Sequence, residues 1–114
     1  MYVLVSNIGY VGTFINIEDV NKIKKHFNDT NIKFVSLYFE HAEIGTVWLV
    51  RYKCGMIYYA STDYDKALIK HKELESINQL YDDLFGVYSA KFGFTDEFVK
   101  LHNIDGLQLE TCST

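Results

Sequence analysis

The sequence predicts a single α+β domain, in which an antiparallel sheet of four to six strands carries helices mainly on one face. Short runs of β-branched and aromatic residues recur along the chain, and Gly, Asn and Asp separate them at hairpin spacing. Segments with apolar residues at helical spacing follow the strands. We expect the domain to span residues 1–110 and residues 111–114 to form a disordered tail.

The composition excludes several classes of protein. The chain has 114 residues, of which 48% are hydrophobic and 23% charged, so it is not intrinsically disordered. No run approaches the ~18 consecutive apolar residues of a membrane span, and the first residues lack the pattern of a signal peptide. Cys54 and Cys112 lie far apart in the sequence and form no metal-binding or redox pair. We therefore expect a cytoplasmic protein with free thiols and no contact with a membrane.

The first third of the chain predicts a hairpin followed by a short helix. Residues 2–6 and 10–15 are rich in strand formers, and Gly9 permits a tight turn between them. Asn16 then caps a helix that ends near residue 29. The apolar residues of its buried face are Val20, Ile23 and Phe27.

The middle of the chain predicts three more strands. They cover residues 32–40, 46–53 and 56–60, with short connections between them. Strands joined by short connections form an antiparallel meander. We therefore expect these three strands to be neighbours in one sheet.

The last part of the chain predicts a long helix and several short elements. Ser61 or Thr62 caps the long helix, whose apolar residues keep helical spacing up to Gly86. His71 lies on its apolar face, so we interpret it as a structural residue. The remaining elements are a strand over 87–94, a helix capped by Thr95, and an edge strand containing Leu107 and Leu109.

Two stretches have similar patterns at an offset of 45 residues. Tyr2–Val5 matches Val47–Val50, and a glycine turn, an aromatic strand residue, a helix cap and a helix follow each of them. The pattern describes a tandem of two strand–strand–helix units. A duplication and convergent patterning of β-rich segments both explain it.

Motifs that carry chemistry are not found, so we expect a non-enzymatic protein without a cofactor or metal. The four histidines lack the spacing of a zinc site, and the sequence contains no phosphate loop or nucleophile motif. Gly9 and Gly12 follow a strand, but a second strand follows them where a phosphate loop needs a helix. We interpret these two glycines as turn and close-packing residues.

Aromatic residues are the most informative feature, at 16% of the chain. Many fall on both faces of the predicted strands between residues 34 and 59, where few helices are available as cover. Tyr and Trp dominate binding hot spots, so a partner is expected to cover part of this surface, and the alternative is an aromatic core. The candidate binding residues are Trp48, Tyr52, Tyr58 and Tyr59, with Glu40 and Glu43 meeting a basic partner.

The order strand, helix, strand, strand, helix over residues 2–75 resembles the RNA-recognition motif. Val3–Ile8 and Gly45–Val50 carry the resemblance. Leu4 replaces the stacking aromatic residue of that family's first strand, and only Trp48 matches a base-stacking position. The resemblance implies a ferredoxin-like layer, with helices on one face of an antiparallel sheet.

The opening Tyr-Val-Leu-Val-Ser-Asn-x-Gly of residues 2–9, with a helix cap and a glutamate after it, resembles small accessory proteins of tailed bacteriophages. Proteins of that kind often bind and inhibit a host protein. Our leading hypothesis is therefore a non-enzymatic binding protein that inhibits a host or anti-phage defence protein in the bacterial cytoplasm. A homodimer is a further expectation.

Two other functions stay open. Tyr and Trp can stack on the base of a nucleotide signal while Arg51, Lys53 or Lys70 meets its phosphates, which describes a sequestering protein for a small ligand. RNA binding through the sheet needs a basic groove. The net charge of −4 disfavours that groove, so nucleic acid is the less favoured partner.

Overall fold

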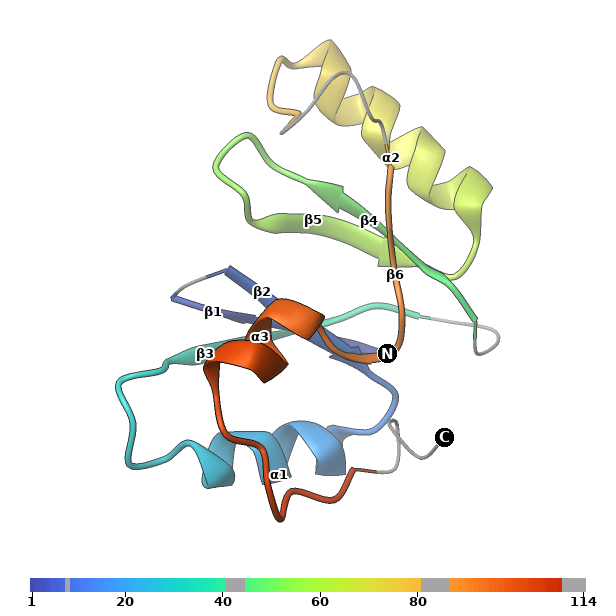
Figure 1. The fold of residues 1–114 in the computed structure, drawn as a ribbon. Helices are drawn as coiled ribbons and strands as arrows, with labels where there is room; N and C mark the ends of the chain where they lie inside the picture. The colour runs from blue at the N-terminus through green and yellow to red at the C-terminus, as the bar shows by residue number, and fades with distance from the viewer. Residues whose placement is uncertain (8, 41–44, 81–86, 110–114) are drawn as a thin grey trace. The chain divides into compact units, whose positions relative to one another are not determined.

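The strands form two antiparallel sheets rather than one, and each sheet belongs to a different unit of the chain (Figure 1). The computed structural model describes residues 1–7, 9–40, 45–80 and 87–109. The first unit comprises residues 1–38 and 91–114, and the second comprises residues 39–90. The predicted α+β class is confirmed, whereas a single domain over residues 1–110 stays a prediction.

The first unit is a four-stranded sheet with the order β3-β1-β2-β7. Gly9 adopts a φ of 119°, which supports the predicted turn between the first two strands. The third strand then returns antiparallel beside the first. The elements are β1 (Tyr2–Ser6), β2 (Gly9–Phe14), α1 (Ile17–His26), β3 (Phe34–Tyr38), β7 (Gly93–Phe94) and α3 (Asp96–Leu101).

The core of the first unit combines the helices with one face of the sheet. The three apolar residues predicted for the buried face of α1 are all buried. Phe34 of β3 packs on Phe27 and Phe98, with ring centroids 5.8 and 6.3 Å away. Each fully buried side chain of this size contributes roughly 1.5–3 kcal/mol. The buried core residues are Leu4, Val11, Phe14, Val20, Ile23, Phe27 and Phe98.

The second unit is a three-stranded sheet with the order β5-β4-β6. α2 packs on the hairpin formed by β4 and β5 (Figure 1). Its buried core residues are Val50, Ala67, Leu74 and Leu80. The elements are β4 (Val47–Arg51), β5 (Ile57–Ser61), α2 (Tyr64–Ser76) and β6 (Tyr88–Ala90).

The two units share one topology. In each, a helix follows a hairpin, and the next strand returns beside the first, which gives the orders β3-β1-β2 and β6-β4-β5. Each hairpin contains a bulge, whose extra residue is Val11 in β2 and Tyr58 in β5. These residues lie 47 positions apart (11 and 58), as do the helix N-caps Asn16 and Asp63 (16 and 63). The predicted tandem of strand–strand–helix units is confirmed, with one more strand in each unit.

The predicted meander of the three middle strands is wrong. β3 pairs with β1 in the first unit, whereas β4 and β5 pair in the second. A short connection shows only that two strands are close in sequence, whereas β3 pairs with β1 over all five of its residues. The ferredoxin-like layer is not confirmed, because each of α1 and α2 packs on its own sheet.

The long helix begins and ends at other residues than predicted. Asp63 caps it, since its Oδ1 accepts the backbone N–H of Asp65 at 3.0 Å. The helix ends at Ser76 because Asn78 adopts a left-handed φ of 58° and the N–H of Gln79 donates to the carbonyl of Leu74 at 2.9 Å. The predicted end at Gly86 lies outside the described residues.

The last elements are partly as predicted. The strand expected over 87–94 is two short strands, β6 and β7, in different sheets. Thr95 caps α3 as predicted, since its Oγ1 accepts the N–H of Phe98 at 3.2 Å. The segment with Leu107 and Leu109 forms no strand.

Gly12 lies where β2 meets β7, and a Cβ atom there would collide with the backbone carbonyl of Gly93. We expect Gly12→Ala to lower the free energy of unfolding by about 1–3 kcal/mol, because backbone must move to admit the methyl group. Urea unfolding measures the loss. Gly45→Ala is the control, since a Cβ at Gly45 has no atom within 4 Å. Equal urea midpoints for the Gly12→Ala and Gly45→Ala variants would contradict the close approach of Gly12 to the carbonyl of Gly93.

Candidate binding surface

The four predicted aromatic residues lie on the face of the second sheet that α2 covers. Trp48, Val50 and Tyr52 alternate onto one face, and Tyr59, which pairs with Val50, shares it. Val50 belongs to the core that α2 buries. The four aromatic residues are half-buried and pack against that core. They therefore border the core on one side and remain accessible on the other.

The bulge in β5 brings Tyr58 onto the same face as Tyr59. Val50 pairs with Tyr59 and Arg51 pairs with Ile57, so Tyr58 is the unpaired extra residue. In a regular strand Tyr58 would point to the opposite face from Tyr59. Its ring instead meets Tyr52 edge to face, with centroids 5.1 Å apart. Its hydroxyl donates to Oε2 of Glu73 at 2.9 Å.

Two charged residues of α2 continue this arrangement. Lys70 Nζ lies 3.5 Å from Oε2 of Glu73 and 5.7 Å from the ring centroid of Tyr59. The side chains of Lys70 and Glu73 remain 37% and 47% exposed, so the pair is a surface feature. We call the three tyrosines and this ion pair together the aromatic row. Its members are Tyr52, Tyr58, Tyr59, Lys70 and Glu73.

Trp48 is not part of the aromatic row. It lies four residues before Tyr52 on β4, which is about 13 Å at 3.3 Å per residue. Its ring meets Tyr64, in the first turn of α2, with centroids 4.9 Å apart and planes at 76°. The structure therefore divides the predicted set into a row near the end of α2 and a separate Trp48–Tyr64 pair near its beginning.

Of the two predicted acidic residues, the structure describes only Glu40. Glu40 is exposed and follows Phe39, whose ring lies 5.5 Å from that of Tyr59. Glu40 is thus close in sequence to a residue that contacts the row. Glu43 lies outside the described residues.

The three basic residues suggested for a nucleotide ligand do not converge. Arg51 pairs with Ile57 and therefore points to the opposite face of the sheet, where its guanidinium lies 3.9 Å from the ring centroid of Tyr88. Lys53 is exposed in the hairpin turn. Lys70 is paired with Glu73, which offsets its charge. The arrangement offers no common phosphate site.

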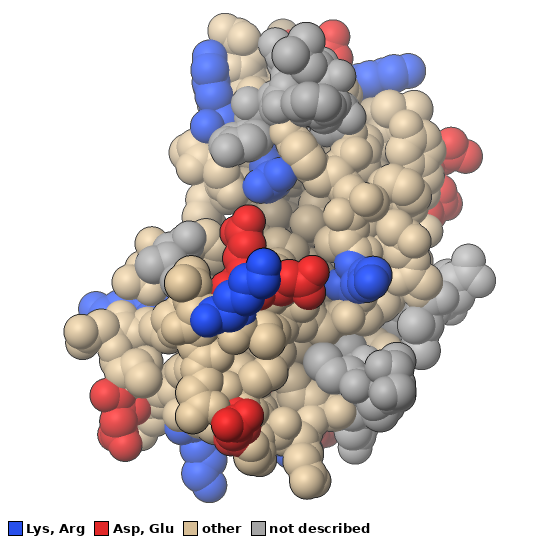
Figure 2. All heavy atoms as spheres, in the orientation of Figure 1, with Lys and Arg blue, Asp and Glu red and all other residues tan. Residues whose placement is uncertain are grey.

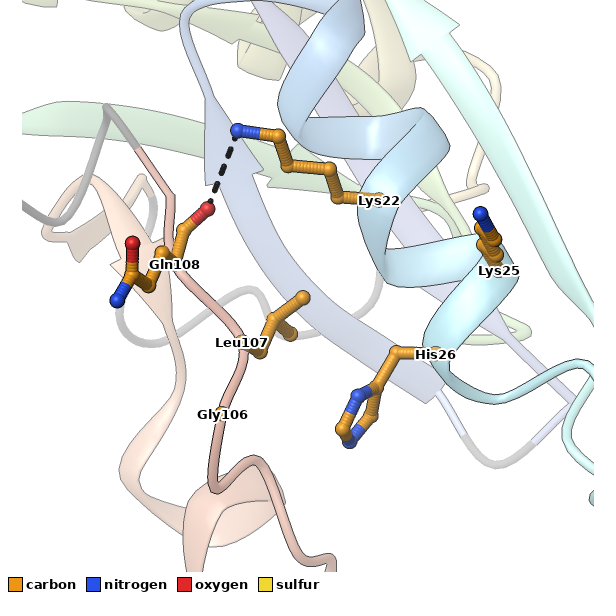
Figure 3. A pocket seen from close by; sticks show the side chains of 6 residues that line it. All are labelled: Lys22, Lys25, His26, Gly106, Leu107 and Gln108. Atoms are coloured by element: carbon orange, nitrogen blue, oxygen red, sulfur yellow. Dashed lines mark hydrogen bonds between the residues drawn. The ribbon is translucent and has the colours of Figure 1, made fainter.

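A hollow of about 520 Å³ lies in the first unit, between α1 and residues 106–108 (Figure 3). Lys22 Nζ donates to the carbonyl of Gln108 at 3.3 Å, and His26 Nε2 lies 2.9 Å from the carbonyl of Asn103. Figure 3 shows the ammonium group of Lys25 directed away from this segment. The basic groups therefore hold the chain against α1 rather than converge on a ligand.

His71 is buried on the apolar face of α2, as the sequence predicts. Its Nδ1 lies 3.7 Å from Oε2 of Glu75. Within the described residues, no group of three His, Cys, Asp or Glu side chains is arranged to hold a metal. Their helices also include none that is long and apolar enough to cross a membrane.

Charged side chains on the face drawn in Figure 2 are mixed in sign. Lys and Arg are interspersed with Asp and Glu among the described residues there, rather than gathered in a patch. Nucleic acid needs a continuous basic surface. This face therefore offers no support for the RNA alternative.

Sequence reasoning missed two residues as contributors to the surface: Glu73 and Phe39. Lys70 and Glu73 have the i, i+3 spacing of a helical ion pair, which the sequence displays. Their proximity to the tyrosines depends on the bulge, for which the sequence gives no local sign. Comparison of the chain with protein families, curated proteins and solved structures gives no match.

The hydrogen bond from Tyr58 to Glu73 raises the pKa of the Tyr58 phenol above its ordinary value of 10.0, and partial desolvation adds to the shift. We expect Glu73→Gln to lower this pKa, because the neutral amide no longer favours the protonated phenol. Titration of the tyrosine ¹³Cζ resonances measures it.

Because the pKa is higher in the folded chain, this bond stabilises the fold below pH ~10 and the contribution is lost as the pH rises through the folded pKa. Glu75→Gln is the matched control, since Glu75 contacts His71 instead. An unchanged Tyr58 titration in Glu73→Gln would contradict the bond.

Proposed function

We propose that the chain is a non-enzymatic protein-binding module whose contact surface is the aromatic row. The observation that carries the proposal is the set of three tyrosines fixed on one side by the core of the second unit and accessible on the other. Tyrosine offers a large apolar ring and a hydroxyl, and it is enriched in binding hot spots.

The side chains of the row are already held in place. Tyr58 is fixed by Tyr52 and Glu73, and the ring of Tyr59 lies beside the ring of Phe39 and the ammonium group of Lys70. Association costs less conformational entropy when the contact residues are ordered beforehand. Rigid tyrosines beside a charge pair suit a protein partner.

Two exposed apolar residues adjoin the row, one in the β4–β5 turn and one at the end of α2. Met56 is 41% exposed and its carbonyl accepts the N–H of Tyr52 at 2.7 Å. Ile77 is 61% exposed and lies one helical turn after Glu73. A partner with an apolar centre and a basic group that meets the exposed Glu40 fits this surface.

We further propose that the partner is a host protein or an anti-phage defence protein in the cytoplasm, and that binding inhibits this partner. The support is the accessory-protein resemblance of residues 2–9 together with the lack of a catalytic motif in the sequence. A nucleotide-sequestering function has less support, because Arg51, Lys53 and Lys70 do not converge.

The test is affinity capture from a bacterial lysate with the double variant Tyr58→Ala, Tyr59→Ala. We expect the captured partner to bind about 10- to 100-fold more weakly, the usual effect of removing hot-spot residues. Calorimetry with the purified partner measures the change in Kd.

Tyr64→Ala is the control, because Tyr64 is an exposed tyrosine of the second unit that pairs with Trp48 outside the row. Circular dichroism establishes that both variants are folded. Equal affinity of a folded double variant and the wild type would remove the row as the binding surface.

A further inference from the structure

Among the described strands at the sheet edges, β3 combines a length of five residues with regular pairing. Natural sheets protect their edges with short strands, bulges or charged residues. Within the described residues, β7 has two residues, β6 has three, and β5 carries the bulge at Tyr58. β3 has five residues, pairs with β1 without a shift in register, and reads Phe-Val-Ser-Leu-Tyr, without charge, proline or glycine. It has none of these protections.

The hydrogen-bonding direction of β3 follows from the pair of residues that directly precedes it, Asn7 and Lys33. The N–H of Asn7 donates to the carbonyl of Lys33 at 3.2 Å, and Asn7 Oδ1 accepts the N–H of Lys33 at 3.3 Å. Bonded pairs alternate along an antiparallel ladder, so Val35 and Leu37 direct their backbone groups to β1. The residues that direct their N–H and C=O groups to the outer edge are Phe34, Ser36 and Tyr38.

No strand of the described residues pairs with that outer edge, because β3 ends the sheet order. The side chains there are also accessible: Val35 is 54% exposed and Tyr38 is 62% exposed. A strand added to this edge would gain backbone hydrogen bonds and would cover apolar side chains.

We propose that this edge binds β3 of a second copy of the chain, antiparallel, about a two-fold axis at Ser36. The outward residues are spaced symmetrically about Ser36, so the copy presents a donor and an acceptor to each of them. Ser36 lies opposite its own copy, and Phe34 lies opposite Tyr38 of the partner subunit.

The side chains favour a second copy over a foreign strand. On the other face of the pair, Val35 lies opposite Leu37 of the partner subunit, so each side-chain pair flanking the axis is apolar or aromatic. No charged side chain within β3 selects a different partner by its sign. The two four-stranded sheets become one sheet of eight strands. This inference does not depend on the aromatic row, which lies in the second unit.

The first test is the molar mass in solution of the intact chain over a concentration series. We expect a shift from monomer to dimer as the concentration of the wild type rises. Ser36→Pro removes one outward N–H and leaves the bonds of Val35 and Leu37 to β1 in place. We expect this variant to stay monomeric at concentrations where the wild type and the control Ser36→Ala are dimers.

A charge exchange tests the register even where Ser36→Pro fails to fold. Ser36→Lys and Ser36→Glu each place like charges opposite one another across the axis, which destabilises the pair. Each variant alone should be monomeric, and an equimolar mixture should form a one-to-one dimer. Dimers of either folded variant alone, a monomeric mixture, or a wild type that stays monomeric at every concentration would each overturn the proposal.

A last readout separates this interface from the proposed function. Hydrogen exchange of the outward amides of Phe34, Ser36 and Tyr38 should slow as the protein concentration rises. The Tyr58→Ala, Tyr59→Ala variant should dimerise like the wild type, since its changes lie in the second unit. Loss of the dimer in that variant, with the fold retained, would contradict an interface confined to β3.

Discussion

The antiparallel pairing of the first strand on both of its sides is the constraint on which each unit depends. β1 lies between β2 and β3, and its residues Val3, Leu4 and Val5 are almost fully buried. β4 has the same place between β5 and β6. A strand in this position has its backbone groups satisfied by two neighbours. A helix of ten residues in the first unit and one of thirteen in the second then packs on the sheet of its own unit.

The bulge of the second hairpin adds an accessible tyrosine to the side of the sheet that carries α2. It moves Tyr58 onto the side of α2, where Tyr52 and Glu73 hold it. Arg51 lies on the opposite face by the ordinary alternation of β4, and its guanidinium packs on the ring of Tyr88 there. One extra residue in β5 thereby brings Tyr58 to the same side as Tyr52 and Tyr59.

Much of the fold could be predicted from local patterns. The first hairpin, the buried face of α1 and the cap at Thr95 follow from residue types at fixed spacings. The pairing of β3 with β1 could not, because it depends on a contact between distant segments. The end of α2 was missed because Ile77 continues the helical spacing, whereas Asn78 reverses the backbone. Trp48 lies apart from the three tyrosines because it lies on β4, four residues before Tyr52, and packs on Tyr64. The place of Tyr58 beside Tyr52 could not be predicted, since the sequence contains no sign of where a bulge shifts the register.

The equivalent positions of Val11 and Tyr58 have a consequence for how such a chain can change. Both are the extra residue of a bulge at the same point of the same topology. Val11 is buried in a core, whereas Tyr58 is half-exposed beside Tyr52. A bulge accommodates either an interior or an exterior side chain without altering the neighbouring pairs. A chain that contains this scaffold twice can bury the extra residue of one bulge in a core and display the extra residue of the other at the surface.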